Sequence, residues 1–77
     1  MRALQRTELN VIELSINGEL RQFPSPLSCA GLVLQLELTG KRIAIERNGE
    51  IVPKSLYDQT ELQSGDQLEV VVAVGGG

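Results

Sequence analysis

The chain has 77 residues, of which 42% are hydrophobic and 22% charged, a composition typical of one small folded domain. Its net charge of −3, its single Phe and Tyr, and the lack of any apolar run of about 18 residues argue against nucleic acid or a membrane as a partner. One cysteine and no histidine exclude an internal disulfide and leave too few ligands for a zinc site, so we expect no bound metal and a reducing, cytoplasmic setting.

A β-hairpin is predicted first. Apolar and polar residues alternate over residues 11–16, which is the pattern of a half-buried strand. Asn17-Gly18 follows, a pair that favours a type I′ turn because both positions need positive φ. Residues 19–23 form the returning strand, which ends before two prolines. The residues expected to face the core are Ile12, Leu14 and Ile16.

One amphipathic helix is predicted next. Ser28 is suited to the N-cap, and Gly40 to the left-handed position after the last turn. The apolar stripe between them follows a helical spacing. Its members are Cys29, Ala30, Leu32, Val33, Leu34 and Leu36. We interpret Cys29 as a core residue, and a reactive thiol is the less favoured alternative.

A second hairpin has the same signals as the first. Residues 43–47 predict a third strand, Asn48-Gly49 a second tight turn, and residues 50–52 a short returning strand. We interpret both Asn-Gly pairs as turn chemistry alone.

The last part of the chain combines a short irregular element with a final strand. Residues 56–62 are predicted to form a short irregular or single-turn element, Gly65-Asp66 a turn, and residues 67–74 the strand. Anchors of the irregular element are expected to be Leu56, Tyr57 and Leu62. Leu68, Val70 and Val72 are expected on one face of the strand. Its valine-rich middle favours a central place in the sheet.

The order β-β-α-β-β-β predicts an α+β fold, a mixed four- to five-stranded sheet with one helix packed across one face. We expect a flexible tail over residues 1–9, the domain over residues 10–74 and a glycine tail over residues 75–77. Ala44, Val71 and Ala73 are expected to form an exposed apolar patch on the sheet face opposite the helix. Glu46 and Arg47 are interpreted as a solvated pair, with docking as the alternative.

Three stretches resemble the ThiS family, the sulfur carriers of thiamin thiazole biosynthesis, which have a ubiquitin-like β-grasp fold. They are "SINGEL" (15–20), "IAIERNGEIVPKSLY" (43–57) and "LQSGDQLEVVVAVGGG" (62–77), and "ERNGEIVP" is the most specific block. The terminal glycines are shared with molybdopterin-synthase small subunits and with ubiquitin-like protein modifiers. These two functions, and a non-covalent interaction domain, stay open as alternatives.

The resemblance implies a carrier that is not itself an enzyme and has no cofactor of its own. An E1-like enzyme would use ATP to adenylate the carboxylate of Gly77. Sulfur from a persulfide, supplied indirectly by a cysteine desulfurase or another donor, would replace AMP, and thiazole synthase would take it from the thiocarboxylate. Gly75 and Gly76 would thread a narrow channel, since glycine has no Cβ. Possible docking contacts are Val72, Val74 and Arg47.

Overall fold

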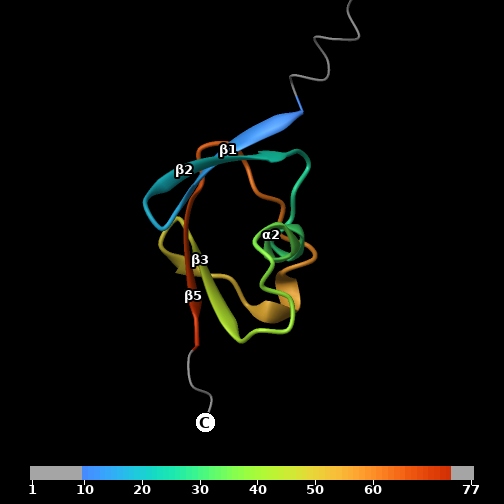
Figure 1. The fold of residues 1–77 in the computed structure, drawn as a ribbon, viewed down its shortest axis with the longest axis vertical. Helices are drawn as coiled ribbons and strands as arrows, with labels where there is room; N and C mark the ends of the chain where they lie inside the picture. The colour runs from blue at the N-terminus through green and yellow to red at the C-terminus, as the bar shows by residue number, and fades with distance from the viewer. Residues whose placement is uncertain (1–9, 74–77) are drawn as a thin grey trace, which may run out of the picture.

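A five-stranded sheet forms one layer of the fold, and the helix with its flanking loops forms the other (Figure 1). The computed structural model describes residues 10–73. Its strands are β1 (Val11–Ile16), β2 (Glu19–Pro24), β3 (Ile43–Arg47), β4 (Glu50–Ile51) and β5 (Gln67–Val72); its helices are α2 (Cys29–Gln35) and the 3-10 turn η1 (Lys54–Leu56). The predicted α+β class, element order and mixed sheet are confirmed.

Strand β5 occupies the central position that its valines predicted. The strand order is β2-β1-β5-β3-β4, and β5 runs parallel to β1 and antiparallel to β3. Its pairing with β1 is short, from Ser15–Gln67 to Ile16–Leu68, whereas its pairing with β3 covers five residues. The end of β5 is therefore held mainly by β3.

Both Asn-Gly pairs form the predicted tight turns. The φ angles are 53° at Asn17 and 89° at Gly18, and 51° at Asn48 and 88° at Gly49. Two successive positive φ angles define the type I′ turn, whose twist matches that of the flanking strands. The two turns thereby fix the register of β1 with β2 and of β3 with β4.

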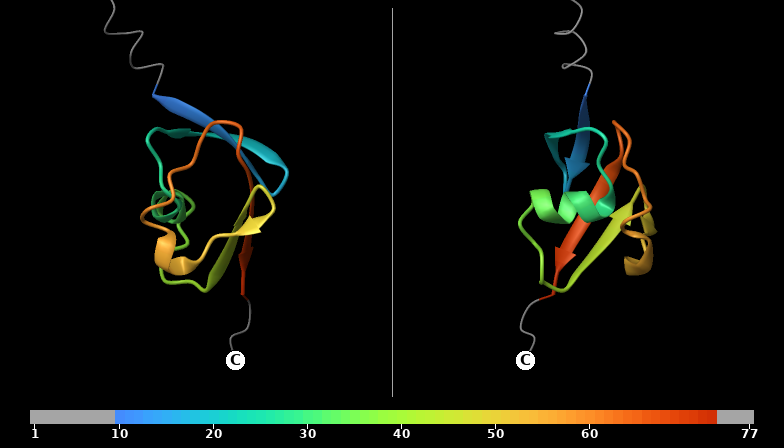
Figure 2. Two further views of the ribbon diagram at one scale, coloured as in Figure 1. Left: turned by 180° about the vertical axis from the view of Figure 1, so that it is seen from behind. Right: turned by 90° about the vertical axis from the view of Figure 1, so that its right-hand side faces the viewer.

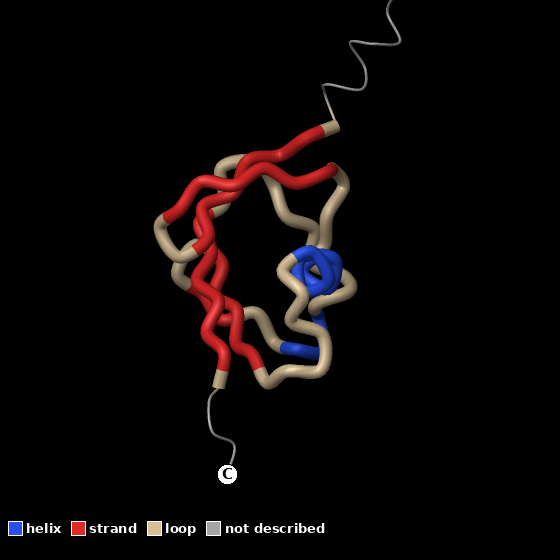
Figure 3. The backbone as a smooth tube through the Cα atoms, viewed as in Figure 1, coloured by secondary structure: helices blue, strands red, loops and turns tan. Residues whose placement is uncertain are grey.

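Figure 3 shows α2 facing the strands of the sheet, and the mainly aliphatic core lies between these two layers. Alternation in β1 places Ile12, Leu14 and Ile16 inward, as predicted. The side chains with the least exposure come from both layers. They are Leu14, Cys29, Leu32, Ile45 and Leu68.

The helix ends earlier than predicted. It begins as expected after Ser28, whose Oγ accepts a hydrogen bond from the Gly31 N–H (3.0 Å). Its end is a Schellman motif in which Glu37, with a φ of 60°, takes the left-handed position, and the Leu38 N–H donates to the Val33 carbonyl (3.0 Å).

Gly40 does not cap the helix, so that expectation was wrong. Its φ of 85° belongs to a separate turn, closed by the Lys41 N–H donating to the Leu38 carbonyl (3.0 Å). The helix has already ended before Gly40, because Glu37 adopts the left-handed conformation first along the chain. The chain then turns again before it enters β3.

Two expected core residues lie on the surface. Leu34 is 66% exposed, because it lies on the side of α2 away from the buried Leu32, and Leu56 is 42% exposed at the end of η1. Tyr57 and Leu62, the other expected anchors of that segment, are buried. Leu34 and Leu56 are both apolar residues that lie next to the core-facing side of a short helical element.

Candidate functional site

The end of β5 positions the glycine tail. Val72 pairs with Ile43, and the Ala73 N–H donates to the Arg42 carbonyl (2.8 Å) as the last described contact of the strand. Of the residues predicted to carry or guide sulfur, Val74, Gly75, Gly76 and Gly77 lie outside the described part of the chain. The geometry of the site is therefore that of the strand that leads into them.

Asn17 extends the short pairing between β1 and β5. Its Oδ1 accepts from the Val70 N–H (2.8 Å), and its Nδ2 donates to the Val70 carbonyl (3.1 Å). The side-chain amide thus continues the ladder after β1 has turned away at Ile16. The interpretation of this asparagine as turn chemistry alone was incomplete.

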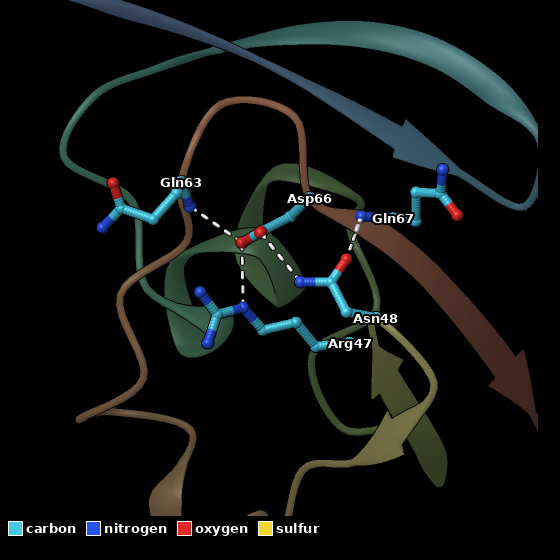
Figure 4. A network of polar contacts seen from close by, with 5 residues as sticks. All are labelled: Arg47, Asn48, Gln63, Asp66 and Gln67. Atoms are coloured by element: carbon cyan, nitrogen blue, oxygen red, sulfur yellow. Dashed lines mark hydrogen bonds and ion pairs between the residues drawn. The ribbon is translucent and has the colours of Figure 1, made fainter.

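Asn48 has a similar role at the start of β5. Its Oδ1 accepts from the Gln67 N–H (2.9 Å), and its Nδ2 donates to the Asp66 carboxylate (3.0 Å) (Figure 4). Both Asn-Gly turns are therefore joined to β5 by their asparagine side chains. The sequence predicted the two turns but not the side-chain hydrogen bonds that join them to β5.

Asp66 is the centre of a polar network rather than a plain turn residue. Its carboxylate accepts hydrogen bonds from the Arg47 Nε (2.8 Å) and the Gln63 N–H (2.9 Å), besides that from Asn48 (Figure 4). The residue is only 7% exposed. Burial alone would raise the pKa of Asp66, but the hydrogen bonds from Gln63, Asn48 and Arg47 and the charge of Arg47 bring it below its ordinary value.

The two predicted docking residues within the described chain lie far apart. Val72 is 37% exposed and pairs with Ile43 at one end of β3, whereas the Arg47 side chain is 30% exposed at the other end. Four residues of strand separate these ends by about 13 Å. Arg47 pairs with Asp66 instead of Glu46, so the expected Glu46–Arg47 pair is replaced by a contact with the loop before β5.

An apolar patch lies on the sheet face opposite α2, where it was expected. Ala44 and Val71 are cross-strand partners, and both are exposed, as is Ala73 at the end of β5. Together with Arg42 and Ile43 they border a shallow depression. The patch therefore lies directly beside the point where the tail begins.

Cys29 belongs to the core and not to this site. Its side chain is fully buried, and burial raises the pKa of its thiol, with a smaller opposing effect from Arg47. A buried neutral thiol is unreactive, which supports the structural interpretation. Between residues 10 and 73 there is neither a cluster of potential metal ligands nor a helix long and apolar enough to cross a membrane.

Several known proteins are similar in sequence to this chain. Residues 14–77 match the ThiS family. The chain is 44% identical over 66 residues to a thiazole synthase of Paramagnetospirillum magneticum, a match that covers 86% of this chain but only 20% of that protein. It is also 41% identical over 46 residues to the sulfur carrier protein ThiS of Bacillus subtilis, covering 60% of this chain and 70% of that protein.

A solved structure has the same fold. The crystal structure of the thiamine biosynthesis protein ThiS from Geobacter metallireducens aligns with a TM-score of 0.72 and 26% sequence identity. The alignment covers 86% of this chain and all of that one. The arrangement of β5 between β1 and β3 therefore occurs in a fold already seen in a ThiS protein.

Proposed function

The chain belongs to the ThiS family of sulfur carriers in thiamine biosynthesis, and we propose that it carries its sulfur as a thiocarboxylate on Gly77. The observation that supports this most directly is the course of β5, a central strand hydrogen-bonded as far as Ala73 and followed by Val74-Gly75-Gly76-Gly77. A rigid domain thus leads into a segment with little steric bulk.

The proposed chemistry takes place on the terminal carboxyl group. A carboxylate resists nucleophilic attack, so an E1-like enzyme first joins it to AMP from ATP and releases pyrophosphate. The outer sulfur of a persulfide, supplied through a cysteine desulfurase or another donor, then attacks the carbonyl carbon, and AMP leaves. A thiol cleaves the resulting S–S bond, which leaves the thiocarboxylate on Gly77 and a disulfide on the donor side.

The domain contributes position rather than catalysis in this scheme. The buried Cys29 offers no nucleophile, and the chain contains no histidine to act as a base. Gly75 and Gly76 would pass through a narrow channel in the partner, while Val74 and Val72 would contact its entrance. ATP would be bound by the activating enzyme.

Thiazole synthase is the proposed acceptor of the sulfur. The match with the Paramagnetospirillum magneticum thiazole synthase supports this, because a stretch similar to this chain occurs within a protein of that name. The acceptor would bind the same tail after the activating enzyme has released it. One segment of the chain would then serve two partners in turn.

The test is an intact-mass measurement of the purified chain. The chain is incubated with ATP, an E1-like adenylating enzyme, a cysteine desulfurase, cysteine and a thiol reductant. We expect a mass gain equal to replacing one oxygen by sulfur, located on Gly77, and no gain in a variant that lacks Gly77. Conjugates of higher mass, or a mass gain located elsewhere, would contradict the proposal.

A further inference from the structure

Three cations surround one shallow cavity at the end of the sheet where β5 stops. Lys41 and Arg42 lie in the loop between α2 and β3, and Lys54 lies at the start of η1. All three are exposed, and they line the same cavity, in which no acidic residue takes part. We call these three residues the basic rim.

The basic rim is unusual in a chain of net charge −3. Within the described residues the one ion pair joins Arg47 to Asp66, so the rim cations have no acidic partner there. On the same sheet, Glu46 and Glu69 are cross-strand partners, and Glu69 lies three positions before Val72, the end of β5. Positive charge is therefore concentrated at the end where the tail begins.

The base of the cavity is apolar. Val33 and Ile43 are half-buried and Tyr57 is buried, and all three line the same cavity as the cations. The volume is about 280 Å³, at the lower limit of small-molecule sites, which are roughly 300–1,000 Å³. It is better matched to one or two side chains of a partner protein than to a nucleotide.

The cavity lies beside the origin of the tail. The Arg42 carbonyl accepts from the Ala73 N–H (2.8 Å), and Figure 2 shows the loop after α2, η1 and the end of β5 at the same end of the domain. Four residues, Val74 to Gly77, span at most about 14 Å. A protein that holds Gly77 in its active site must therefore place the entrance of that site against this end of the domain.

We propose that the basic rim and its cavity bind an acidic segment at the active-site entrance of the adenylating enzyme. Asp or Glu side chains of that segment would pair with Lys41, Arg42 and Lys54, and one apolar side chain would enter the cavity. This inference rests on the proposed function and identifies the surface chemistry of the first partner.

Exposed charge pairs suit a carrier that must change partners. They add little to the lifetime of a complex but speed its formation, because opposite charges steer the encounter. The depression bordered by Ala44, Val71 and Ala73 shares Arg42 and Ile43 with the cavity, so both surfaces can meet one partner together. Fast association and ready release follow from this combination.

The experiment measures association of the full chain with the purified adenylating enzyme by stopped flow at several salt concentrations. Lys41→Glu and Lys54→Glu are compared with Arg21→Glu, which makes the same change of charge on β2, the strand at the opposite edge of the sheet. We expect the two rim variants to associate about tenfold more slowly at low salt, with a flatter salt dependence, and Arg21→Glu to match the wild type.

Further readouts separate docking from folding and from the proposed chemistry. Unfolding midpoints identify any variant that is unstable, and Lys41→Gln and Lys54→Gln then give a milder test with an intermediate rate expected. At saturating carrier, the rim variants should gain sulfur at the wild-type maximal rate. Rim variants that associate as fast as Arg21→Glu, while the wild type gains sulfur, overturn this inference alone. A wild-type chain that gains no sulfur overturns the proposed function and this inference with it.

Discussion

The side-chain amide of Asn17 binds both backbone polar groups of Val70, with the N–H 2.8 Å from Oδ1 and the carbonyl 3.1 Å from Nδ2. Strand β1 ends at Ile16, so without this amide Val70 would have no partner on that side of β5. A turn residue thereby completes the ladder of the strand that leads to the tail.

Replacing Asn17 by Gly removes the amide and keeps the positive φ that the turn needs. We expect the free energy of unfolding to fall by about 1–3 kcal/mol, because two part-buried backbone groups of Val70 lose their partner. Urea denaturation measures this change. An unchanged midpoint would show that the amide contributes nothing to stability.

Asp66→Asn is expected to lower stability by roughly 1–3 kcal/mol at neutral pH, because a charged acceptor of three hydrogen bonds is lost. The folded-state pKa of Asp66 lies below its ordinary value of 3.8. The ionised group therefore stabilises the fold above that value, and the contribution is lost as the pH falls through the folded-state pKa.

Denaturation midpoints measured from pH 7 down to pH 2 test this dependence on pH. The wild type should lose stability relative to Asp66→Asn as the medium becomes acidic. Asp58→Asn, at an exposed position, is the matched control. Parallel curves for wild type and Asp66→Asn would contradict the assignment of the network to Asp66.

The helix offers a matched pair of leucines. Leu32 is fully buried and Leu34 is exposed, two positions apart in α2. Leu32→Ala should cost about 2–5 kcal/mol through lost burial and a cavity. Leu34→Ala should stay within about 0.5 kcal/mol of the wild type. Equal losses in thermal unfolding would mean that the helix face is assigned incorrectly.

Cys29→Ala separates the core role of this residue from sulfur chemistry. The buried thiol should be dispensable for thiocarboxylate formation, while stability falls by about 1 kcal/mol. Intact mass after the sulfur-transfer reaction measures thiocarboxylate formation, and urea denaturation measures stability. A folded variant that gains no sulfur would assign the thiol a chemical role.

Gly76→Ala tests the proposed passage of the tail through a narrow channel. The added Cβ should slow sulfur gain by about 100-fold, the effect of displacing the reacting group by roughly 1 Å. The unfolding midpoint should not change, since the substitution lies beyond Ala73, which makes the last described contact of β5. Sulfur gain at the wild-type rate would argue against a tight channel.

Local signals predicted the sheet well. Alternation in β1 and the two Asn-Gly turns determine strand, turn and register within a few residues of sequence. The central place of β5 followed from its valines. These features depend on neighbours along the chain, which the sequence displays directly.

The end of the helix, the role of Asp66 and the basic rim were not predicted from the sequence. The helix end was missed because a non-glycine residue, Glu37, adopts the left-handed conformation before Gly40 does. The role of Asp66, in the loop before β5, depends on contacts with Arg47 and Asn48 of the β3–β4 hairpin. The basic rim joins Lys54 to Lys41 and Arg42, which only the packing of η1 beside the loop brings together.

The place of β5 between two strands also determines how the domain bears a pull on its tail. Hydrogen bonds between antiparallel strands lie perpendicular to the strand axis, so a force along β5 loads the bonds to β3 in shear. Hydrogen bonds loaded in shear must break together, whereas the bonds of a strand that is peeled away from its neighbour break one after another. In the proposed function, strand β5 would therefore serve as a mechanical anchor while a partner draws the glycines into its active site.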